Sequence, residues 1–467
     1  MGRGARCADA RPAQPPHSVQ RQAGIAASIP RRVIALMRRY IGRPAGFVLP
    51  ALTLAGCGMF DNMVDSGPAE GNVGYVSGFL GGVAADEPHA ALAARDVLSA
   101  GGTAADAAVA AAFMMSVTLP SRVGLMGGGA CLAYGAGHAE ADAIVFPAGR
   151  PVGTGGGDRP AAVPLLARGL FALHARHGRR PFESLLAPAE QAARFGTRVS
   201  RALARDLAPV ATPLFADPQI RAVFAGSNGA PLTEGAMLTQ VLLSTTLAQL
   251  RVAGVGDMYN GTLAQRIASA APQAGASLTV PELRAALPRV VQAVTVPAGN
   301  DIAAFLPPPA DPAGATAAAF QGGNVGSVGG ALPASATVVT LDRDGNSVAC
   351  AFSMNNLWGT GRMLPGTGMI AAAAPDTGAV RAPVLAAGLA FNANRRAFRA
   401  VAAGSGQGGA PAAAAAALRA AIAGQAPTVA DPGRFNAIGC PGLVPGREAT
   451  CRWFTDPRGS GLAAGAD

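Results

Sequence analysis

Residues 335–355 read SATVVTLDRDGNSVACAFSMN, and the fold prediction rests on this stretch. Two runs rich in β-branched and apolar residues, Thr337–Leu341 and Val348–Met354, flank the polar segment Asp342–Asn346. Such runs favour strands, and an Asp-Gly step between them is typical of a tight turn. The stretch therefore predicts a β-hairpin.

The register of this hairpin brings polar side chains together. If Asp342 faces Asn346 across the loop, antiparallel pairing places Ser335 opposite Ser353. Asn355 then lies just beyond the end of the second strand. Two hydroxyls and one amide are expected to meet at one end of the hairpin.

The segment before the hairpin, Phe305–Ala334, contains three consecutive prolines and many glycines, and it predicts a flexible connector. Ser335 is the first residue after it. A serine at a newly cut N-terminus can use its own α-amine, with a pKa of about 8, as general base. Such a nucleophile needs no histidine partner, and all histidines precede Ser335: His17, His89, His138, His174 and His177.

Two helices are predicted near the start of the folded region. The alanine-rich run His89–Leu98 is followed by Gly101–Gly102, which breaks a helix. Thr103 then has the position of an N-cap, with Asp106 three residues later as its capping partner. The pattern predicts a tight helix-turn-helix.

The next segments alternate between strands and helices. The glycine-rich run Gly124–Gly129 precedes short apolar stretches, Ala130–Tyr134 and Ala143–Phe146, that suit buried strands. A phosphate loop would need a lysine, and the chain contains none. Pro164–Leu207 and Phe215–Arg289 are predicted to be mainly helical.

Composition excludes some classes of protein. The chain is 50% hydrophobic and 14% charged, which is enough apolar sequence for a sizeable core. Its net charge is +10, but nine arginines and one aspartate precede Cys57, which leaves only +2 for the rest. This distribution does not suit a nucleic-acid-binding surface, and we expect no nucleic-acid partner.

Residues 1–57 predict a signal region. The apolar run Phe47–Leu54 follows a basic stretch and is too short to span a bilayer, so it suits the core of a signal peptide. The sequence LAGC that ends at Cys57 resembles a lipoprotein cleavage box, in which Cys57 would be lipidated. An ordinary signal peptide is the alternative, and translation could also begin at Met37. We expect an exported, periplasmic protein held to the membrane only by a lipid anchor.

Export permits disulfides. Cys440 and Cys451 are close enough in sequence to close a local loop and form a possible disulfide. Cys131 and Cys350 lie in apolar segments and are expected to be buried free thiols. No histidine or cysteine cluster has the spacing of a metal site, so neither a metal nor a cofactor is expected.

Several segments of the chain, in this order and spacing, resemble the gamma-glutamyltranspeptidase family. The resemblance implies the N-terminal-nucleophile fold, a four-layer αββα sandwich, in a precursor that cuts itself. It divides the chain into a large-subunit region, 58–334, and a small-subunit region, 335–467. The matching segments are Ala84–Val109, Gly124–Gly129, Pro188–Ser200, Pro231–Gly261, Phe305–Pro309, Asp344–Asn346, Asn355–Gly361 and Asp456–Gly459.

The resemblance also implies catalytic positions. The family's threonine nucleophile falls on Ser335, with Thr337 as the reserve candidate. Ser353 falls on a threonine that supports the nucleophile, and Asn355 on the asparagine beside it. The pair Gly408–Gly409 matches the glycines whose amides form the oxyanion hole, where a Cβ would obstruct the substrate carbonyl.

The residues that select γ-glutamyl groups in the family are largely replaced. The arginine that clamps the substrate carboxylate is Pro147 here, with Arg150 as a possible substitute. Residues that hold the α-amine fall on Ala374 and Thr377, and a pair of serines falls on Ala386–Ala387.

Three functions are therefore open, and the first two act on a small amide substrate. The first is an amidohydrolase or acyltransferase for γ-glutamyl or related groups. The second is an acylase-like enzyme whose longer acyl group occupies a pocket lined with alanines. The third is a non-catalytic envelope lipoprotein that retains the fold.

Overall fold

The structure, a computed structural model, describes residues 78–152, 158–323 and 334–466. The predicted signal region, its lipidation residue Cys57 and the end of the predicted connector lie outside these ranges. Within them, no helix has the length and apolarity needed to cross a membrane. The same ranges contain no group of three or more His, Cys, Asp or Glu side chains that could hold a metal ion.

The predicted hairpin is present. Strands β9 (Ser335–Asp342) and β10 (Ser347–Ser353) pair so that the serine that begins β9 faces the serine that ends β10. Asp342 closes the turn, because its Oδ1 accepts hydrogen bonds from the backbone amides of Asp344 and Asn346, both at 3.0 Å. Both the element and its register are confirmed.

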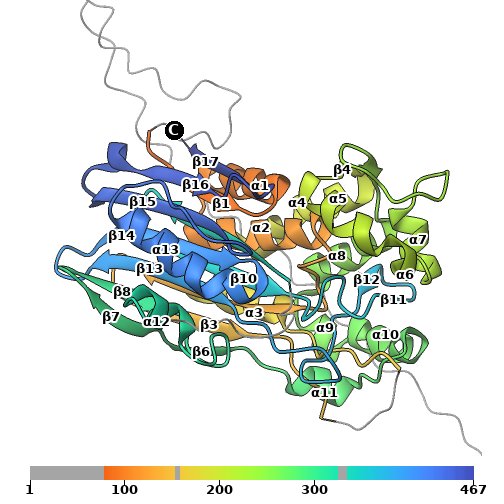
Figure 1. Cartoon of the computed structure of the whole chain (residues 1–467). Helices are drawn as coiled ribbons and strands as arrows, with labels where there is room; N and C mark the ends of the chain where they lie inside the picture. Colours follow the sequence, from red (N-terminus) through yellow and green to blue (C-terminus); the bar gives the residue numbers. More distant parts are fainter. Residues whose placement is uncertain (1–77, 153–157, 324–333, 467) are drawn as a thin grey trace, which may run out of the picture. The chain divides into compact units, whose positions relative to one another are not determined.

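The hairpin lies in the middle of a seven-stranded antiparallel sheet, here called the first sheet (Figure 1). β9 also pairs with β1, and β10 also pairs with β2, so neither strand of the hairpin is a sheet edge. In spatial order the strands are β17 (Leu462–Ala466), β1 (Gly81–Ala85), β9, β10, β2 (Gly128–Gly135), β3 (Glu140–Phe146) and β6 (Arg289–Gln292).

A second, six-stranded antiparallel sheet packs against the first. The contact is an apolar layer to which the first sheet contributes Leu132 and Val339, and the second sheet Leu389, Val401 and Ile438. The strands of the second sheet, in spatial order, are β16 (Arg452–Thr455), β15 (Arg434–Val444), β14 (Ala397–Ser405), β13 (Ala386–Asn392), β8 (Asp301–Phe305) and β7 (Val294–Ala298).

Helices cover the outer face of each sheet (Figure 1). The first sheet carries α1 (Pro88–Ser99), α2 (Ala104–Thr118) and α3 (Leu166–His177), and the second carries α12 (Ala315–Phe320) and α13 (Ala410–Ile422). The layers therefore follow the order helix, sheet, sheet, helix. The predicted αββα sandwich is confirmed.

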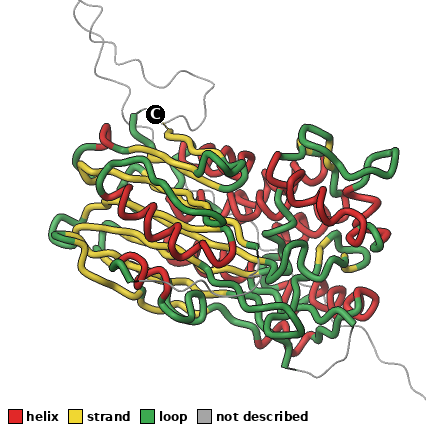
Figure 2. The backbone as a smooth tube through the Cα atoms, viewed as in Figure 1, coloured by secondary structure: helices red, strands yellow, loops and turns green. Residues whose placement is uncertain are grey.

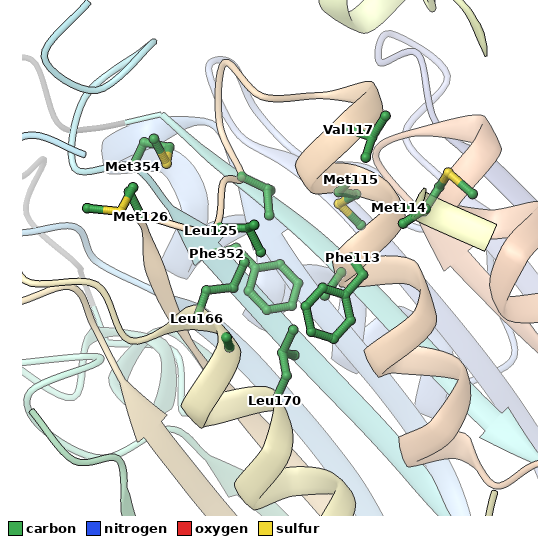
Figure 3. Packing of buried hydrophobic residues seen from close by; sticks show 14 of the residues in the cluster. Phe113, Met114, Met115, Val117, Leu125, Met126, Leu166, Leu170, Phe352 and Met354 are labelled. Carbon is green, nitrogen blue, oxygen red and sulfur yellow. The ribbon is translucent and has the colours of Figure 1, made fainter. Parts of the chain in front are cut away.

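The packing of the helices against the first sheet fixes β10 beside the predicted site. Figure 3 shows Phe352 of β10 among Phe113 of α2 and Leu166 and Leu170 of α3, all of them buried. Burying one such side chain contributes roughly 1.5–3 kcal/mol. The strand that ends at Ser353 is thus held on its outer face by a well-packed core.

The predicted helix-turn-helix consists of α1 and α2. Thr103 caps α2 through a capping box, in which its Oγ1 accepts from the Asp106 amide and Asp106 Oδ2 accepts from the Thr103 amide. Every residue of α2 is buried, which its many alanines permit because small side chains allow close packing on all sides.

A largely helical segment, residues 182–285, gathers at one end of the strand layers (Figure 2). It matches the prediction of mainly helical structure. Its helices are α4 (Phe182–Phe195), α5 (Arg201–Leu207), α6 (Ala211–Leu214), α7 (Pro218–Phe224), α8 (Val241–Ala253), α9 (Asp257–Asn260), α10 (Thr262–Ala270) and α11 (Val280–Ala285).

The connector prediction was wrong for residues 305–323. This part contains the end of β8 and the helix α12. Both carboxylate oxygens of Asp311 accept hydrogen bonds from the first amides of that helix, at Ala315 (2.9 Å) and Thr316 (2.8 Å). The alanine run after Asp311 favours a helix more strongly than the preceding prolines oppose it.

The prediction of free thiols at Cys131 and Cys350 was also wrong. Cys131 in β2 lies directly opposite Cys350 in β10, and the two form a disulfide. The pairing of these strands, 219 residues apart at this point, brings the sulfurs together. The possible Cys440–Cys451 disulfide is present.

Candidate functional site

Strand alternation directs the two serines into the space between the sheets. Val338 and Phe352 belong to the core on the helix side of the hairpin, whereas Val339 belongs to the core between the sheets. Because side chains alternate along a strand, Ser335 and Ser353 share the inter-sheet face with Val339. Both serines are buried, and Ser335 is only 3% exposed.

Ser353 contacts the peptide bond that a cut before Ser335 would break. Its Oγ donates a hydrogen bond to the carbonyl oxygen of Ala334 at 2.9 Å. The same Oγ accepts from the backbone amide of Asn355 at 2.9 Å, which orients the hydroxyl. A donor at this carbonyl oxygen is placed to stabilise the negative charge that develops there during nucleophilic attack.

Asn355 is held rigidly beside this hydroxyl. Its φ of +59° is a left-handed conformation that asparagine tolerates better than most residues. Its Nδ2 donates to the carbonyl oxygens of Ala148 (3.0 Å) and Ala373 (2.9 Å). Its Oδ1 is buried and has no hydrogen-bond partner among the described residues. The site therefore contains a fixed acceptor that a bound group could use.

An arginine that the sequence analysis did not identify contacts the same strand. Arg122 forms a two-pronged ion pair with Asp206, with both N–O distances at 2.7 Å. Its Nη1 also approaches the carbonyl oxygen of Ser335 at 3.5 Å. Ser121 Oγ donates to the same Asp206 carboxylate at 2.7 Å. Burial lowers the pKa of Arg122, but the bonds and charge of Asp206 raise it overall, so the guanidinium stays charged.

Asp86 was also missed, and it holds β9 from the other side. Its Oδ2 accepts from the Thr337 amide (2.9 Å) and from Thr337 Oγ1 (3.3 Å), and its Oδ1 accepts from Asn436 Nδ2 (2.8 Å). Thr337 Oγ1 also accepts from Asn436 at 2.7 Å. The hydroxyl of the reserve nucleophile is therefore fully buried and already engaged.

The pKa of Asp86 is raised. Burial of the carboxylate is the main cause, and it outweighs the nearby Arg122 charge and the hydrogen bonds from Asn436 and Thr337, which lower the pKa. Ser405, at the end of β14, also lies close enough to lower it. Asp86 thus links the hairpin to the second sheet at the point where Ser335 begins β9.

We expect the stability of the wild type, measured relative to Asp86→Asn, to fall as the pH rises. In the unfolded chain the Asp86 carboxyl has a pKa of about 3.9. In the folded protein this pKa is raised, so the carboxyl keeps its proton to higher pH. The stabilisation is complete below about pH 4 and is lost as the pH rises through the raised pKa, by up to about 1.4 kcal/mol per pH unit. Urea unfolding of both proteins across this range measures the difference. A difference that stays constant or grows with pH would contradict the assignment.

The glycine pair Gly408–Gly409 lies in a 3-10 turn, Gln407–Gly409, just after β14. The Gly409 amide donates to the Gly406 carbonyl at 3.1 Å, so an oxyanion would have to displace this bond. A Cβ on Gly409 would lie 2.6 Å from the Gly433 amide nitrogen. Packing against Gly433 is thus sufficient reason for a glycine at 409.

Within the described residues, the alanines that were expected to line an acyl pocket are buried and do not face an open cavity. The exposed fraction of Ala374, Ala386 and Ala387 is at most 2%. Ala386 packs against Ala410 and Ala414 of α13, and Ala387 lies in the core between the sheets. The small side chains of Ala386 and Ala387 in β13 allow the neighbouring layers to pack closely against the strand, so these two residues form core and not a cavity wall.

Arg150 lies on a different cavity, which has a volume of about 420 Å³. The arginine is exposed, and the other lining residues come from 149–152, from 163–165, and from α11 and the turn after it. The cavity residue Gly149 directly follows Ala148, whose carbonyl oxygen accepts a hydrogen bond from Asn355 Nδ2, but Asn355 itself does not line the cavity.

Comparison with known proteins identifies relatives of this chain. The family model for Gamma-glutamyltranspeptidase matches residues 90–321, a range that ends before the hairpin. Glutathione hydrolase 3 of Arabidopsis thaliana is 29% identical over 241 residues, which are 49% of this chain and 38% of the relative. The glutathione hydrolase 5 proenzyme of Homo sapiens is 32% identical over 255 residues, 51% of this chain and 42% of the relative. The chain thus spans about two fifths of the length of these relatives.

A solved structure shares the fold over most of the chain. The cephalosporin acylase of Bacillus halodurans superposes with a TM-score of 0.68 at 19% identity, covering 87% of this chain and 99% of the acylase. At this identity the likeness concerns the fold alone.

Proposed function

Because the chain is a divergent member of the gamma-glutamyltranspeptidase family, we propose that it is an amidohydrolase that cuts itself before Ser335. The new N-terminal serine would then transfer or hydrolyse an acyl group. The observation that carries this proposal is the hydrogen bond from Ser353 Oγ to the carbonyl oxygen of Ala334, at the predicted cut.

Self-cleavage would proceed through an ester. Ser335 Oγ attacks the carbonyl carbon of Ala334, the C–N bond breaks, and the hydroxyl proton passes to the Ser335 nitrogen. Ser353 stabilises the oxyanion of this step. Water then hydrolyses the ester, which releases the Ala334 carboxylate and a free Ser335 hydroxyl.

The cut would supply the general base for turnover. The freed α-amine of Ser335, with a pKa of about 8, takes the hydroxyl proton as Oγ attacks the substrate amide. The amine product leaves, and water or an amine acceptor removes the acyl group from Ser335. The buried Oδ1 of Asn355, unpartnered among the described residues, is available to accept from the new α-amine or the substrate. Gly408 and Gly409 remain our candidates for the oxyanion hole of this step.

The cut would divide the folded chain into regions 58–334 and 335–467. We further propose that residues 1–57 direct export to the periplasm and that Cys57 carries a lipid anchor, on the basis of the apolar run and the LAGC box.

An acylase-like specificity is the second candidate. Its support is the replacement of the family's γ-glutamyl-binding residues by Pro147, Ala374 and the core alanines Ala386–Ala387. Each lost hydrogen bond to a charged group removes about 1.5–3 kcal/mol, and an alanine in a closed core cannot replace it.

Reducing electrophoresis of purified protein tests the proposal. We expect two fragments, the smaller with Ser335 at its N-terminus by terminal sequencing. Release of nitroaniline from γ-glutamyl anilide would support the first specificity, and release only from other acyl anilides the second. A single uncut chain without turnover would favour the non-catalytic lipoprotein.

A further inference from the structure

The proposed cut would give two fragments that share both sheets. A cut before Ser335 leaves β1, β2 and β8 on the large fragment (58–334) and β9, β10, β13 and β17 on the small fragment (335–467). In the first sheet, β9 and β10 lie between β1 and β2, and β17 pairs with the other side of β1. In the second sheet, β8 pairs with β13. The strands of the two fragments therefore interleave, and neither fragment contains a complete sheet.

One disulfide connects the two regions. Cys131 lies in β2 on the large-fragment side, and Cys350 lies opposite it in β10 on the small-fragment side. The disulfide Cys440–Cys451 has both of its cysteines in the small-fragment region. Of the two disulfides in the described part of the chain, only Cys131–Cys350 thus crosses the proposed cut.

From this placement we propose that the Cys131–Cys350 disulfide joins the two fragments covalently after the cut, so that the mature protein is one covalent molecule made of two chains. The inference rests on the proposed self-cleavage before Ser335, and it adds a covalent link to the strand pairing between the fragments. The cut breaks only the peptide bond between Ala334 and Ser335, so it leaves the bond between the sulfurs unchanged.

The disulfide forms before the precursor is completely folded. Both cysteines are fully buried in the core between the first sheet and its helices, where an external oxidant does not reach the sulfurs. The two thiols lose two protons and two electrons, and a disulfide-bearing oxidant accepts them and becomes a dithiol. Self-cleavage needs the folded site, so the bond is already present when the cut is made. The uncut Ser335→Ala protein should therefore contain the same disulfide.

The disulfide lies on the face of the first sheet away from the two serines of the site. Cys350 belongs to the helix-side core together with Phe352, whereas Ser353 has the opposite side of the strand. Strand pairing places Ser353 opposite Gly128, three residues along each strand from the cysteines. The bond thus fixes β2 to β10 near the site without occupying it, and its removal should leave the cut intact.

The cut changes what the bond contributes to stability. In the precursor, the backbone already joins the two regions, so unfolding does not separate them. After the cut, fragments without the disulfide would separate when they unfold, and the stability of such a complex depends on protein concentration. A covalent link keeps the two fragments in one molecule, so the linked protein should unfold independently of concentration.

Electrophoresis with and without reductant tests the link in purified protein. After alkylation of free thiols, the cut wild type should run as one band without reductant and as two bands with it. The double variant Cys131→Ala/Cys350→Ala should give two bands in both conditions, and the matched control Cys440→Ala/Cys451→Ala should behave like the wild type. Two wild-type bands without reductant would overturn the inference.

A non-reduced tryptic digest tests the bond without requiring the cut or any cysteine variant. Trypsin cleaves after arginine except before proline, so Cys131 falls in peptide 123–168 and Cys350 in peptide 344–362. Neither peptide contains the proposed cut, and we expect the same cross-linked pair from the wild type and from Ser335→Ala. Absence of this pair from both proteins would overturn the link even if the chain cuts itself. Its presence in a wild type that is never cut would keep the bond and reject the proposed cleavage, and with it the two-chain product.

Dilution tests the energetic role of the link. A tenfold dilution of cut protein should leave the urea midpoint of the wild type unchanged and lower that of Cys131→Ala/Cys350→Ala. The uncut Ser335→Ala protein is the control, and its midpoint should not respond to dilution, with or without the two cysteines. A midpoint of the cut wild type that falls on dilution as much as that of the double variant would contradict the covalent link.

Discussion

Ser335→Ala is expected to leave the chain uncut and to lower amide turnover by about 10³-fold or more. The variant removes the oxygen that attacks the Ala334 carbonyl, and it also removes the free α-amine that the cut would create. Losses of this size are typical when an enzyme loses its nucleophile. Reducing electrophoresis and initial rates with acyl anilides measure the two effects.

Ser347→Ala is the matched control for this variant. Ser347 is a fully buried serine of the same hairpin, and its Oγ donates to the Thr340 carbonyl at 2.8 Å, away from the cut. Ser347→Ala should lower the free energy of unfolding slightly and leave cleavage complete. A cut that persists in Ser335→Ala before Thr337 would move the nucleophile to the reserve candidate.

Asp206→Ala is expected to lower the free energy of unfolding by about 3–5 kcal/mol. The variant leaves the Arg122 guanidinium without its carboxylate partner, and Ser121 loses its acceptor. The side chains of Asp206 and Arg122 are only 8% and 26% exposed, so water compensates little of the loss. Because Arg122 also reaches the Ser335 carbonyl, the fraction of chains that are cut should fall as well.

Glu234→Ala is the comparison for Asp206→Ala. Glu234 pairs with Arg201 on the surface, where the two side chains are 53% and 59% exposed. Such a pair contributes at most about 1 kcal/mol, and its loss should not change the cut fraction. Urea unfolding together with electrophoresis measures both quantities. Equal destabilisation by the two variants would show that the Arg122–Asp206 pair has no special role.

Much of the site could be predicted from local sequence. The register that pairs Ser335 with Ser353 follows from a short turn between two strands, and Asn355 comes two residues later. The capping box at Thr103 is equally local. In each case the interacting groups are separated by few residues, so a pattern of residue types determines the contact.

The predictions from sequence that proved wrong concern contacts between segments that are far apart in the chain. Cys131 and Cys350 are 219 residues apart, and only the pairing of β2 with β10 shows that they meet. An alanine such as Ala386 or Ala387 can line a cavity or fill a core. In the structure α13 packs against Ala386 and the first sheet packs against the layer that contains Ala387, so both residues are part of the core. A residue type alone does not specify which neighbouring layer covers it.

The sequence by itself determined the hairpin, its register and the family resemblance, because these depend on short-range pairing and on the order of motifs. The tertiary structure alone showed that Arg122, with Asp206, and Asp86, with Asn436, hold the strand of Ser335 from two sides. It also placed Arg150 on a largely apolar cavity that includes Gly149, the residue after the Asn355 partner Ala148. These contacts join segments that are far apart in sequence, and no local periodicity encodes which strands and helices lie against one another.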